Sequence, residues 1–363
     1  MNKKLIWLAI FLIAVSGLVL TKYMLTKDSE PEKKIPVVRV LEERRNILFL
    51  PHYLAMELGF FAEQNIDVQL KTVPPGETAH NILDEGKADV IIAGPGQVIL
   101  ADPIKGVNSP KAFAEITQKD GSFFIARETN ENFQWTDVKN RTIISGYPTE
   151  DTSLILEYIL RQHEIAPNWH CNVIENLPIE LRPGAFKSGS GSFIVVDEPN
   201  ATLLENQQMG KVVASLGNDA GNMPAAVYMA NPQYLDSKTT VVQGLVNGLH
   251  KTQQWMMYHS VEEMANLVAD YFPDYERDLL IAIIKRYKNI DLWSDNPIID
   301  KVSYDNLYTA IESSGELVNK SSYSKAVTNH YAQRAVRTVH YVPEDKQKPK
   351  PGLNWRYIKS LFS

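Results

Sequence analysis

The feature that most constrains the fold of this chain is the alternation of short apolar runs with helical stretches that begins at Val37. Residues 37–41 and 89–93 are rich in valine and isoleucine and have the length of strands, whereas residues 51–61 have the apolar periodicity of an amphipathic helix. Short strands that alternate with helices are typical of a mainly parallel sheet covered by helices. The sequence therefore predicts an α/β fold.

This alternation occurs twice, and a mainly helical segment follows the second set. The extended runs at residues 122–127 and 225–230 flank the second set, at the positions expected for chain crossings between two lobes. One architecture explains this order: a second α/β lobe interrupts the first, and the chain then returns to complete the first lobe with helices. The predicted ranges are 37–122 for the first part of lobe 1, 123–230 for lobe 2, 231–339 for the helical completion of lobe 1 and 340–363 for a tail.

The first 25 residues have the composition of a transmembrane anchor or a signal segment. Two lysines precede an uncharged run over residues 5–20, and the apolar character resumes at residues 23–25. A cleaved signal peptide has an apolar core of roughly 7–15 residues, whereas about 20 apolar residues span a bilayer as a helix. We therefore expect an uncleaved anchor in the cell membrane, with cleavage after Ser16 as the alternative. Both alternatives place the body outside the cytoplasm, with residues 26–36 as a linker.

Composition and motifs exclude several classes of function. The formal net charge is −6 and the body of the chain has no visible basic patch, which argues against a nucleic-acid partner. The single cysteine, Cys171, excludes an intramolecular disulfide and a zinc site built from cysteines. His52 and His80 have no partner at metal-ligand spacing, and no nucleophile elbow or P-loop is present. We therefore expect a protein that is not an enzyme and holds no cofactor or metal. We also expect a monomer.

Glycines follow the predicted strand at residues 89–93, where ligands bind in open α/β sheets. Gly94, Gly96 and Gln97 stand in this turn, and their backbone N–H groups can donate to an anion or a carbonyl oxygen. The glycines would also let a ligand approach closely. A plain turn is the alternative.

Carboxylates occupy two further turns. Asp120 and Ser122 stand at the start of a predicted crossing run and are candidates for ligand contact, although turn chemistry alone also explains the Asp-Gly pair. Glu198 follows the apolar run at residues 193–196, so its carboxylate is predicted to accept a hydrogen bond from a ligand amine. The alternative is that Asp197 and Glu198 only start the next helix.

Segments spread over most of the chain resemble a known family. Residues 51–70, PHYLAMELGFFAEQNIDVQL, contain a helix that ends in Gly-Phe-Phe, followed by an acidic turn and a strand. This pattern is similar to the opening of the SsuA/THI5-like (NMT1-type) solute-binding proteins of ABC transporters, a family for sulfonates, nitrate and thiamine-pyrimidine precursors. Further matching segments follow in the family's order, at residues 88–96, 119–123, 133–137, 156–160, 185–186, 198–199, 212–217, 286–287, 293 and 315–317.

The resemblance covers about residues 38–337 and implies a type II periplasmic-binding-protein fold, with the ligand held between two lobes that close about a hinge. It implies a small organic solute, thiamine-pyrimidine-like or sulfonate-like, and an ABC permease and its ATPase as partners. One alternative is a membrane-tethered sensor of the same solute. Another is a THI5-like enzyme of pyrimidine synthesis, but those enzymes carry a cysteine-rich motif that Cys171 alone does not supply.

Two segments depart from the family pattern where the cleft is expected. Residues 147–151, YPTED, stand in place of a glycine-rich segment, and residues 217–223 precede Pro-Ala-Ala where relatives more often have an aromatic–polar pair. By their positions, Tyr147, Thr149 and Asn222 join the candidate ligand-binding residues. These departures leave the identity of the ligand open.

Overall fold

The computed structural model describes residues 34–343, except for residues 97–98, 100–108, 129–131 and 316–321, together with residue 346. The described residues from Val37 onward belong to one compact unit. The predicted anchor at residues 1–25 and most of the predicted tail lie outside the described residues. Within the part that is described, no helix is both long enough and apolar enough to cross a membrane.

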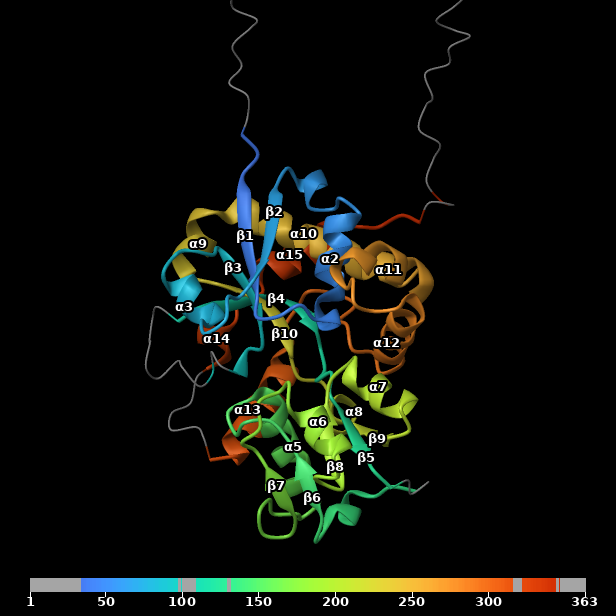
Figure 1. Ribbon diagram of the computed structural model, residues 1–363. Coiled ribbons are helices and arrows are strands. Elements are labelled where there is room, and N and C mark those ends of the chain that lie inside the picture. The colour runs from blue at the N-terminus through green and yellow to red at the C-terminus, as the bar shows by residue number, and fades with distance from the viewer. Residues whose placement is uncertain are drawn as a thin grey trace, which may run out of the picture. The chain divides into compact units, whose positions relative to one another are not determined.

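One five-stranded sheet has the strand order β2-β1-β3-β10-β4 (Figure 1). Its strands are β1 (Val37–Glu42), β2 (Asp67–Thr72), β3 (Val90–Ala93), β4 (Lys111–Thr117) and β10 (Ala226–Ala230). β1 runs parallel to β2 and β3, whereas β10 runs antiparallel to β3 and β4. Every residue of β3 and β10 is buried, which is the pattern of central strands covered on both faces.

A second five-stranded sheet has the order β7-β6-β8-β5-β9. Its strands are β5 (Phe123–Ala126), β6 (Thr142–Ile144), β7 (Asn172–Ile174), β8 (Phe193–Val196) and β9 (Lys211–Ser215). β6 is parallel to β7 and β8, and β5 is antiparallel to β8 and β9. We call the part built on the first sheet lobe 1 and the part built on this sheet lobe 2.

Helices cover both sheets, and their sequences explain where they begin and which face they bury. In α5, Leu154, Ile155 and Ile159 are buried while Arg161 is exposed, as its amphipathic periodicity predicts. The predicted capping box at the start of α11 is present, because Ser260 and Glu263 cap each other's backbone N–H groups. The α-helices are α2 (Leu50–Glu57), α3 (Ala79–Asp84), α5 (Asp151–Gln162), α6 (Arg182–Lys187), α7 (Asn200–Asn206), α8 (Leu216–Ala220), α9 (Pro232–Ser237), α10 (Thr239–Met256), α11 (Val261–Val268), α12 (Arg277–Asn289), α13 (Lys301–Ser313), α14 (Tyr323–Ala326) and α15 (His330–Thr338). The short 3-10 helices are η1 (Ile47–Phe49), η2 (Ala62–Gln64), η4 (Trp135–Val138) and η5 (Ala269–Tyr271).

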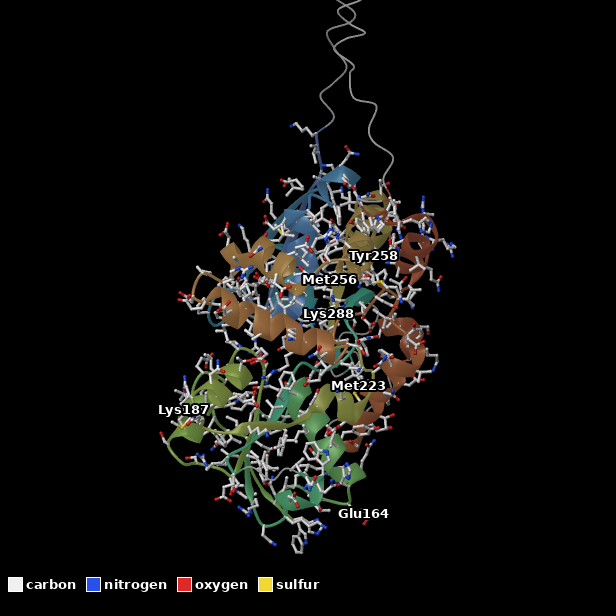
Figure 2. All side chains as sticks on the ribbon, turned by 90° about the vertical axis from the view of Figure 1, so that its right-hand side faces the viewer. Glu164, Lys187, Met223, Met256, Tyr258 and Lys288 are labelled. Atoms are coloured by element: carbon white, nitrogen blue, oxygen red, sulfur yellow. The ribbon has the colours of Figure 1, made fainter. Side chains whose placement is uncertain are left out.

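Two of the chain segments that cross between the lobes run side by side. One leads from β4 to β5, and the other leads from β9 through α8 to β10. The Met223 N–H donates to Gln118 O at 2.9 Å, and the Ala225 N–H donates to Thr117 O at 3.1 Å. In Figure 2, Met223 lies where the two lobes meet, with Tyr258 on the side of lobe 1 and Lys187 on the side of lobe 2.

The predicted α/β architecture of two lobes joined by crossing segments is confirmed, but two elements differ from the predicted ranges. β10 falls in the range predicted for lobe 2, yet it pairs into the sheet of lobe 1. α13 falls in the range predicted to complete lobe 1, yet it packs against α5, and its Leu307 and Ile311 lie in a buried cluster with residues of both lobes. An apolar helix face does not identify the lobe that it covers, so the division of the chain by residue number stays a proposal.

Candidate functional site

A cavity of about 480 Å³ lies where the two lobes meet. Its walls come from the carboxyl ends of β1, β3 and β8, from the crossing segment before β5, and from the first turn of α5. Ligands bind at this edge of open α/β sheets, and the volume is in the range of small-molecule sites. We therefore take this cavity as the candidate binding site.

The charged residues of the cavity wall are mostly acidic. Arg44 donates to Asp197 at 2.6 Å, and Arg182 forms a two-pronged ion pair with Glu150 at 3.0 and 2.6 Å. The Asn46 amide also donates to Asp197, at 3.1 Å, so residues after β1 in lobe 1 contact a residue after β8 in lobe 2. Six carboxylates and two guanidinium groups line the cavity: Glu43, Asp120, Glu150, Asp151, Glu180, Asp197, Arg44 and Arg182.

Asp120 is buried on the crossing segment and organises the neighbouring hydroxyl groups. Its Oδ1 accepts from the Ser122 N–H at 2.8 Å, and its Oδ2 accepts from the Thr152 hydroxyl at 3.1 Å. Burial raises the pKa of the Asp120 carboxyl, and the hydrogen bonds from Ser122 and Thr152 offset part of that rise. Asp120 thus joins the crossing segment to the first turn of α5.

Asp151, the first residue of α5, reaches across to lobe 1. A Cβ atom at Gly94 or Gly96 would overlap its carboxylate, so only glycine permits this approach. Oδ1 of Asp151 is shielded from solvent and has no hydrogen-bond partner. Burial raises the pKa of Asp151 to about 7, the carboxylates of Glu43 and Asp120 add to the rise, and the Gly96 N–H opposes it.

Four of the nine residues predicted to bind the ligand line this cavity, and the other described ones do not. Gly94, Asp120, Ser122 and Tyr147 line the cavity. Gly96 does not line it but contacts Asp151 beside it. The exposed residues Thr149 and Asn222 and the buried Glu198 are not among its lining residues, and Gln97 lies outside the described residues.

Sequence reasoning missed several charged residues of the wall. Glu43 and Arg44 directly follow β1, and this strand-end position was the signal that could have identified them. Asp151 follows the candidate Thr149 closely but has the sequence position of an ordinary helix start. Arg182 carries no local signal, because only the fold brings it to Glu150.

Glu198 has the contacts of a helix-start residue. Its carboxylate accepts from the Thr202 N–H at 3.0 Å and from the Thr202 hydroxyl at 2.9 Å, and it lies 3.2 Å from the Arg286 guanidinium. These contacts match the second of the two alternatives for this residue, in which Glu198 starts the helix.

We expect Glu198→Gln to leave solute affinity unchanged within about twofold, because the side chain does not line the cavity. The variant should lose about 1–2 kcal/mol of unfolding free energy, since hydrogen bonds to a charged group become neutral ones. Chemical denaturation measures the loss, and titration with a bound solute measures the affinity. A tenfold loss of affinity with unchanged stability would return Glu198 to the binding site.

The histidines considered for metal binding are packing residues. His52 Nδ1 lies 2.6 Å from the Tyr228 hydroxyl, and burial lowers the pKa of His52 to about 3. His80 is also buried, in helix α3. Among the residues that the structure describes, no group of three or more His, Cys, Asp or Glu side chains is arranged to hold a metal ion.

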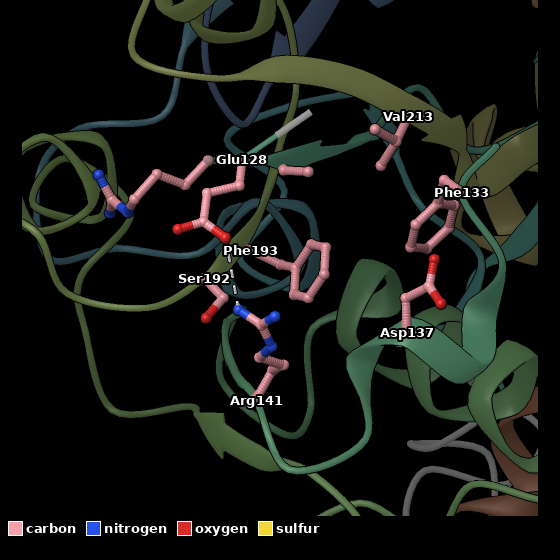
Figure 3. Close-up of a pocket in the computed structure, with 9 residues that line it drawn as sticks. Glu128, Phe133, Asp137, Arg141, Ser192, Phe193 and Val213 are labelled. Carbon is pink, nitrogen blue, oxygen red and sulfur yellow. Dashed lines mark ion pairs between the residues drawn. The ribbon is translucent and has the colours of Figure 1, made fainter. Parts of the chain in front are cut away.

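A second cavity, of about 310 Å³, lies on lobe 2 alone (Figure 3). Phe133, Phe193 and Val213 form its apolar part, and Glu128 pairs with Arg141 at 3.7 Å beside it. Both members of this pair are more than half exposed, so the pair contributes little free energy. Because its walls come from a single lobe, this cavity is not the candidate for capture between lobes.

Comparisons with known proteins agree with this architecture. Residues 46–263 match the family described as NMT1/THI5 like. The chain is 30% identical over 304 residues to the Bacillus subtilis (strain 168) protein named "Putative binding protein YtlA", and the match covers 84% of this chain and 91% of that protein.

Two solved structures are similar to the whole body of the chain. The ligand binding component of an ABC-type import system from Staphylococcus aureus, with zinc bound, aligns with a TM-score of 0.66 at 17% identity, covering 84% of this chain and all of that one (100%). The periplasmic aliphatic sulphonate binding protein SsuA from Escherichia coli aligns with a TM-score of 0.63 at 14% identity, covering 80% and 97%. These two likenesses confirm the predicted periplasmic-binding-protein fold and show the fold alone. On the family match and the identity to YtlA, the chain belongs to the NMT1/THI5-like family.

Proposed function

We propose that this chain is the extracytoplasmic solute-binding component of an ABC importer. It captures a small organic solute between its lobes and delivers it unchanged to a permease and its ATPase. The observation that carries the proposal is the 480 Å³ cavity, which has walls from both lobes beside two crossing segments. The names of similar proteins support it, because YtlA is named as a binding protein and the S. aureus structure as part of an ABC-type import system. We further propose that residues 1–25 tether the protein to the membrane.

The contacts between the lobes suit a cleft that opens and closes. A solute that touches both lobes stabilises the closed arrangement by the difference between its affinities for the two states. Arg44 is half exposed where it pairs with Asp197 across the lobes, and such a pair contributes roughly 1 kcal/mol or less. This pair therefore opposes separation of the lobes only weakly when the solute leaves.

Capture without conversion is supported by the side chains of the cavity wall. The described lining residues include no histidine, cysteine or lysine, so a hydroxyl–histidine pair, a thiolate or an amine nucleophile is not available among them. The hydroxyls of Ser122 and Thr152 lie 3.2 Å apart, and Thr152 is held by Asp120. These contacts give the two hydroxyls a positioning role.

The proposal is tested by a thermal-shift screen of the purified protein against aminopyrimidines, amines, sulfonates and nitrate. A solute at 100 times its Kd should add about 2.7 kcal/mol of stability, which gives a clear rise in Tm. Chromatography after prolonged incubation should recover that solute unchanged. Steady consumption of the solute, or no stabilisation by any member of these classes, would contradict the proposal.

A further inference from the structure

The cavity wall holds more negative charge than its own cations neutralise. Arg44 is paired with Asp197, and Arg182 is paired with Glu150. That leaves four lining carboxylates without an ion-pair partner among the residues that the structure describes: Glu43, Asp120, Asp151 and Glu180. The excess is concentrated where the crossing segment meets α5.

Two of the four carboxylates are shielded from water, which makes their charge costly. Asp120 is only 7% exposed, and the Oδ1 atom of Asp151 is inaccessible to solvent and unbonded. Thr152 joins the two, since it donates to Asp120 and follows Asp151 in the chain. Carboxylates held in this way require a counter-charge, or one of them takes up a proton.

The remainder of the cavity wall is suited to an apolar body. Phe49, Ile155, Val195 and Leu307 line it. Tyr147 lines it as well, with 42% of its surface exposed. Aromatic faces attract cations, and the Arg182 guanidinium already lies 5.9 Å from the centre of this ring. A solute that fits this wall carries its charge at one end and apolar surface at the other.

We infer that the solute is an organic cation, an ammonium or amidinium group on a small apolar body, whose charge is held by Asp120 and Asp151. The inference rests on the proposed function, because it names the solute class of the same cavity. Such a group donates hydrogen bonds to both carboxylates and supplies the missing positive charge. Asp151 lines the cavity and has no ion-pair partner among the described residues, so a cation there supplies its counter-charge.

Two other classes of solute fit the wall less well. A sulfonate or nitrate ion would lie beside uncompensated carboxylates, and the backbone at Gly94 and Gly96, which was the predicted anion contact, is already approached by Asp151. A metal ion needs three or more clustered ligands, and the described residues provide no such group. The cavity wall is therefore negatively charged, whereas an anion such as a sulfonate requires positive charge or free N–H donors.

The solute class is tested with panels that share one carbon skeleton. Benzamidine and benzylamine are compared with benzenesulfonate, benzoate and benzamide, and alkylamines and aminopyrimidines are compared with the matching sulfonates and alcohols. We expect the cationic members to raise the Tm of the purified protein and the anionic members to leave it unchanged. Stabilisation by a sulfonate or carboxylate whose amine counterpart has no effect would overturn the inference.

Matched variants locate the charge. Asp151→Asn should weaken binding of the stabilising amine or amidine roughly tenfold to a hundredfold, the range for hydrogen bonds to a charged group. The same substitution should raise the Tm of the empty protein at pH 8, because it removes an uncompensated carboxylate. Asp278→Asn is the control, since Asp278 also stands in the first turn of a helix but is exposed and is not among the lining residues. Unchanged affinity in Asp151→Asn, or a lowered Tm of the empty variant, would remove Asp151 from the site.

The experiment separates the inference from the proposed function. One-to-one binding of an anionic solute would overturn the charge assignment and leave the capture function standing. Consumption of any solute, or the absence of binding from every panel, would overturn both. Asp120→Asn is a second test of the charge assignment. We expect calorimetry to show a loss of cation affinity of the same order as in Asp151→Asn.

Discussion

Gly217→Ala is expected to destabilise the protein by about 2–3 kcal/mol and to weaken solute binding about tenfold. A Cβ atom on Gly217, in α8, would overlap Asp120 O and lie 3.1 Å from Asp120 N. These are backbone atoms, so the crossing segment itself has to move, and overpacking of this kind costs about 1–3 kcal/mol. The movement displaces Asp120, whose carboxylate holds the Ser122 N–H and the Thr152 hydroxyl. Chemical denaturation and calorimetric titration measure the two effects.

The control for this substitution is Gly184→Ala. Gly184 lies in α6 of the same lobe, and a Cβ atom there would have no neighbour within 4 Å. An alanine in a helix is favoured over glycine by up to about 1 kcal/mol, so the control should be neutral or slightly stabilised with unchanged affinity. If Gly217→Ala behaved like Gly184→Ala, the two crossing segments would not be packed as described.

Between pH 5 and pH 8, the wild type is expected to lose roughly 3–4 kcal/mol of unfolding free energy relative to the variant Glu115→Gln. Glu115 is buried in β4, its Oε2 accepts from Ser294 at 2.6 Å, and its Oε1 has no partner. Burial raises the pKa of Glu115 to about 8, the Ser294 hydrogen bond opposes the rise, and Asp300 and Asp295 add to it.

The sign follows from the number of bound protons. A folded-state pKa above the unfolded value means that the folded protein binds more protons between the two values, so stability falls as the pH rises through that window. Wild type should therefore lose stability relative to Glu115→Gln from about pH 5 to pH 8. Urea denaturation at several pH values measures the difference, and groups that titrate in both proteins cancel. The exposed Glu262→Gln is the control, and equal slopes for wild type and Glu115→Gln would show that Glu115 is ionised when folded.

Periodicity was sufficient to predict most of the scaffold. The runs at residues 37–41 and 89–93 correspond to β1 and β3, and the stretch at residues 51–61 overlaps α2, which is buried over residues 50–55 and not on one face alone as predicted. Each of these depends on local sequence, because runs of valine and isoleucine favour strands and the longer apolar stretch favours a helix. The partner of an element is a non-local property, so the sequence did not identify the sheet that β10 joins or the packing of α13 against α5.

For the candidate site, the sequence predicted only those residues that stand next to the ends of strands. Gly94, Asp120 and Ser122 were found because they follow or precede strands at the edge where ligands bind. Glu198 also follows a strand, but its side chain turns to Thr202 and Arg286. Asp151 was missed because its partners, Gly94 and Gly96, stand more than fifty residues earlier in the sequence.

The central claim, that one solute is captured unchanged in the cavity between the lobes, is tested most directly by calorimetric titration of the protein and of Ala225→Trp. Ala225 lines the cavity where the second crossing segment enters β10, so a tryptophan there fills the space that a solute needs. The measurement uses the solute that gives the largest rise in Tm, with its recovery checked by mass spectrometry. We predict one solute per chain in the wild type, no measurable binding in Ala225→Trp, and complete recovery of the solute. Undiminished binding in the variant, or a chemically altered solute, would contradict the account.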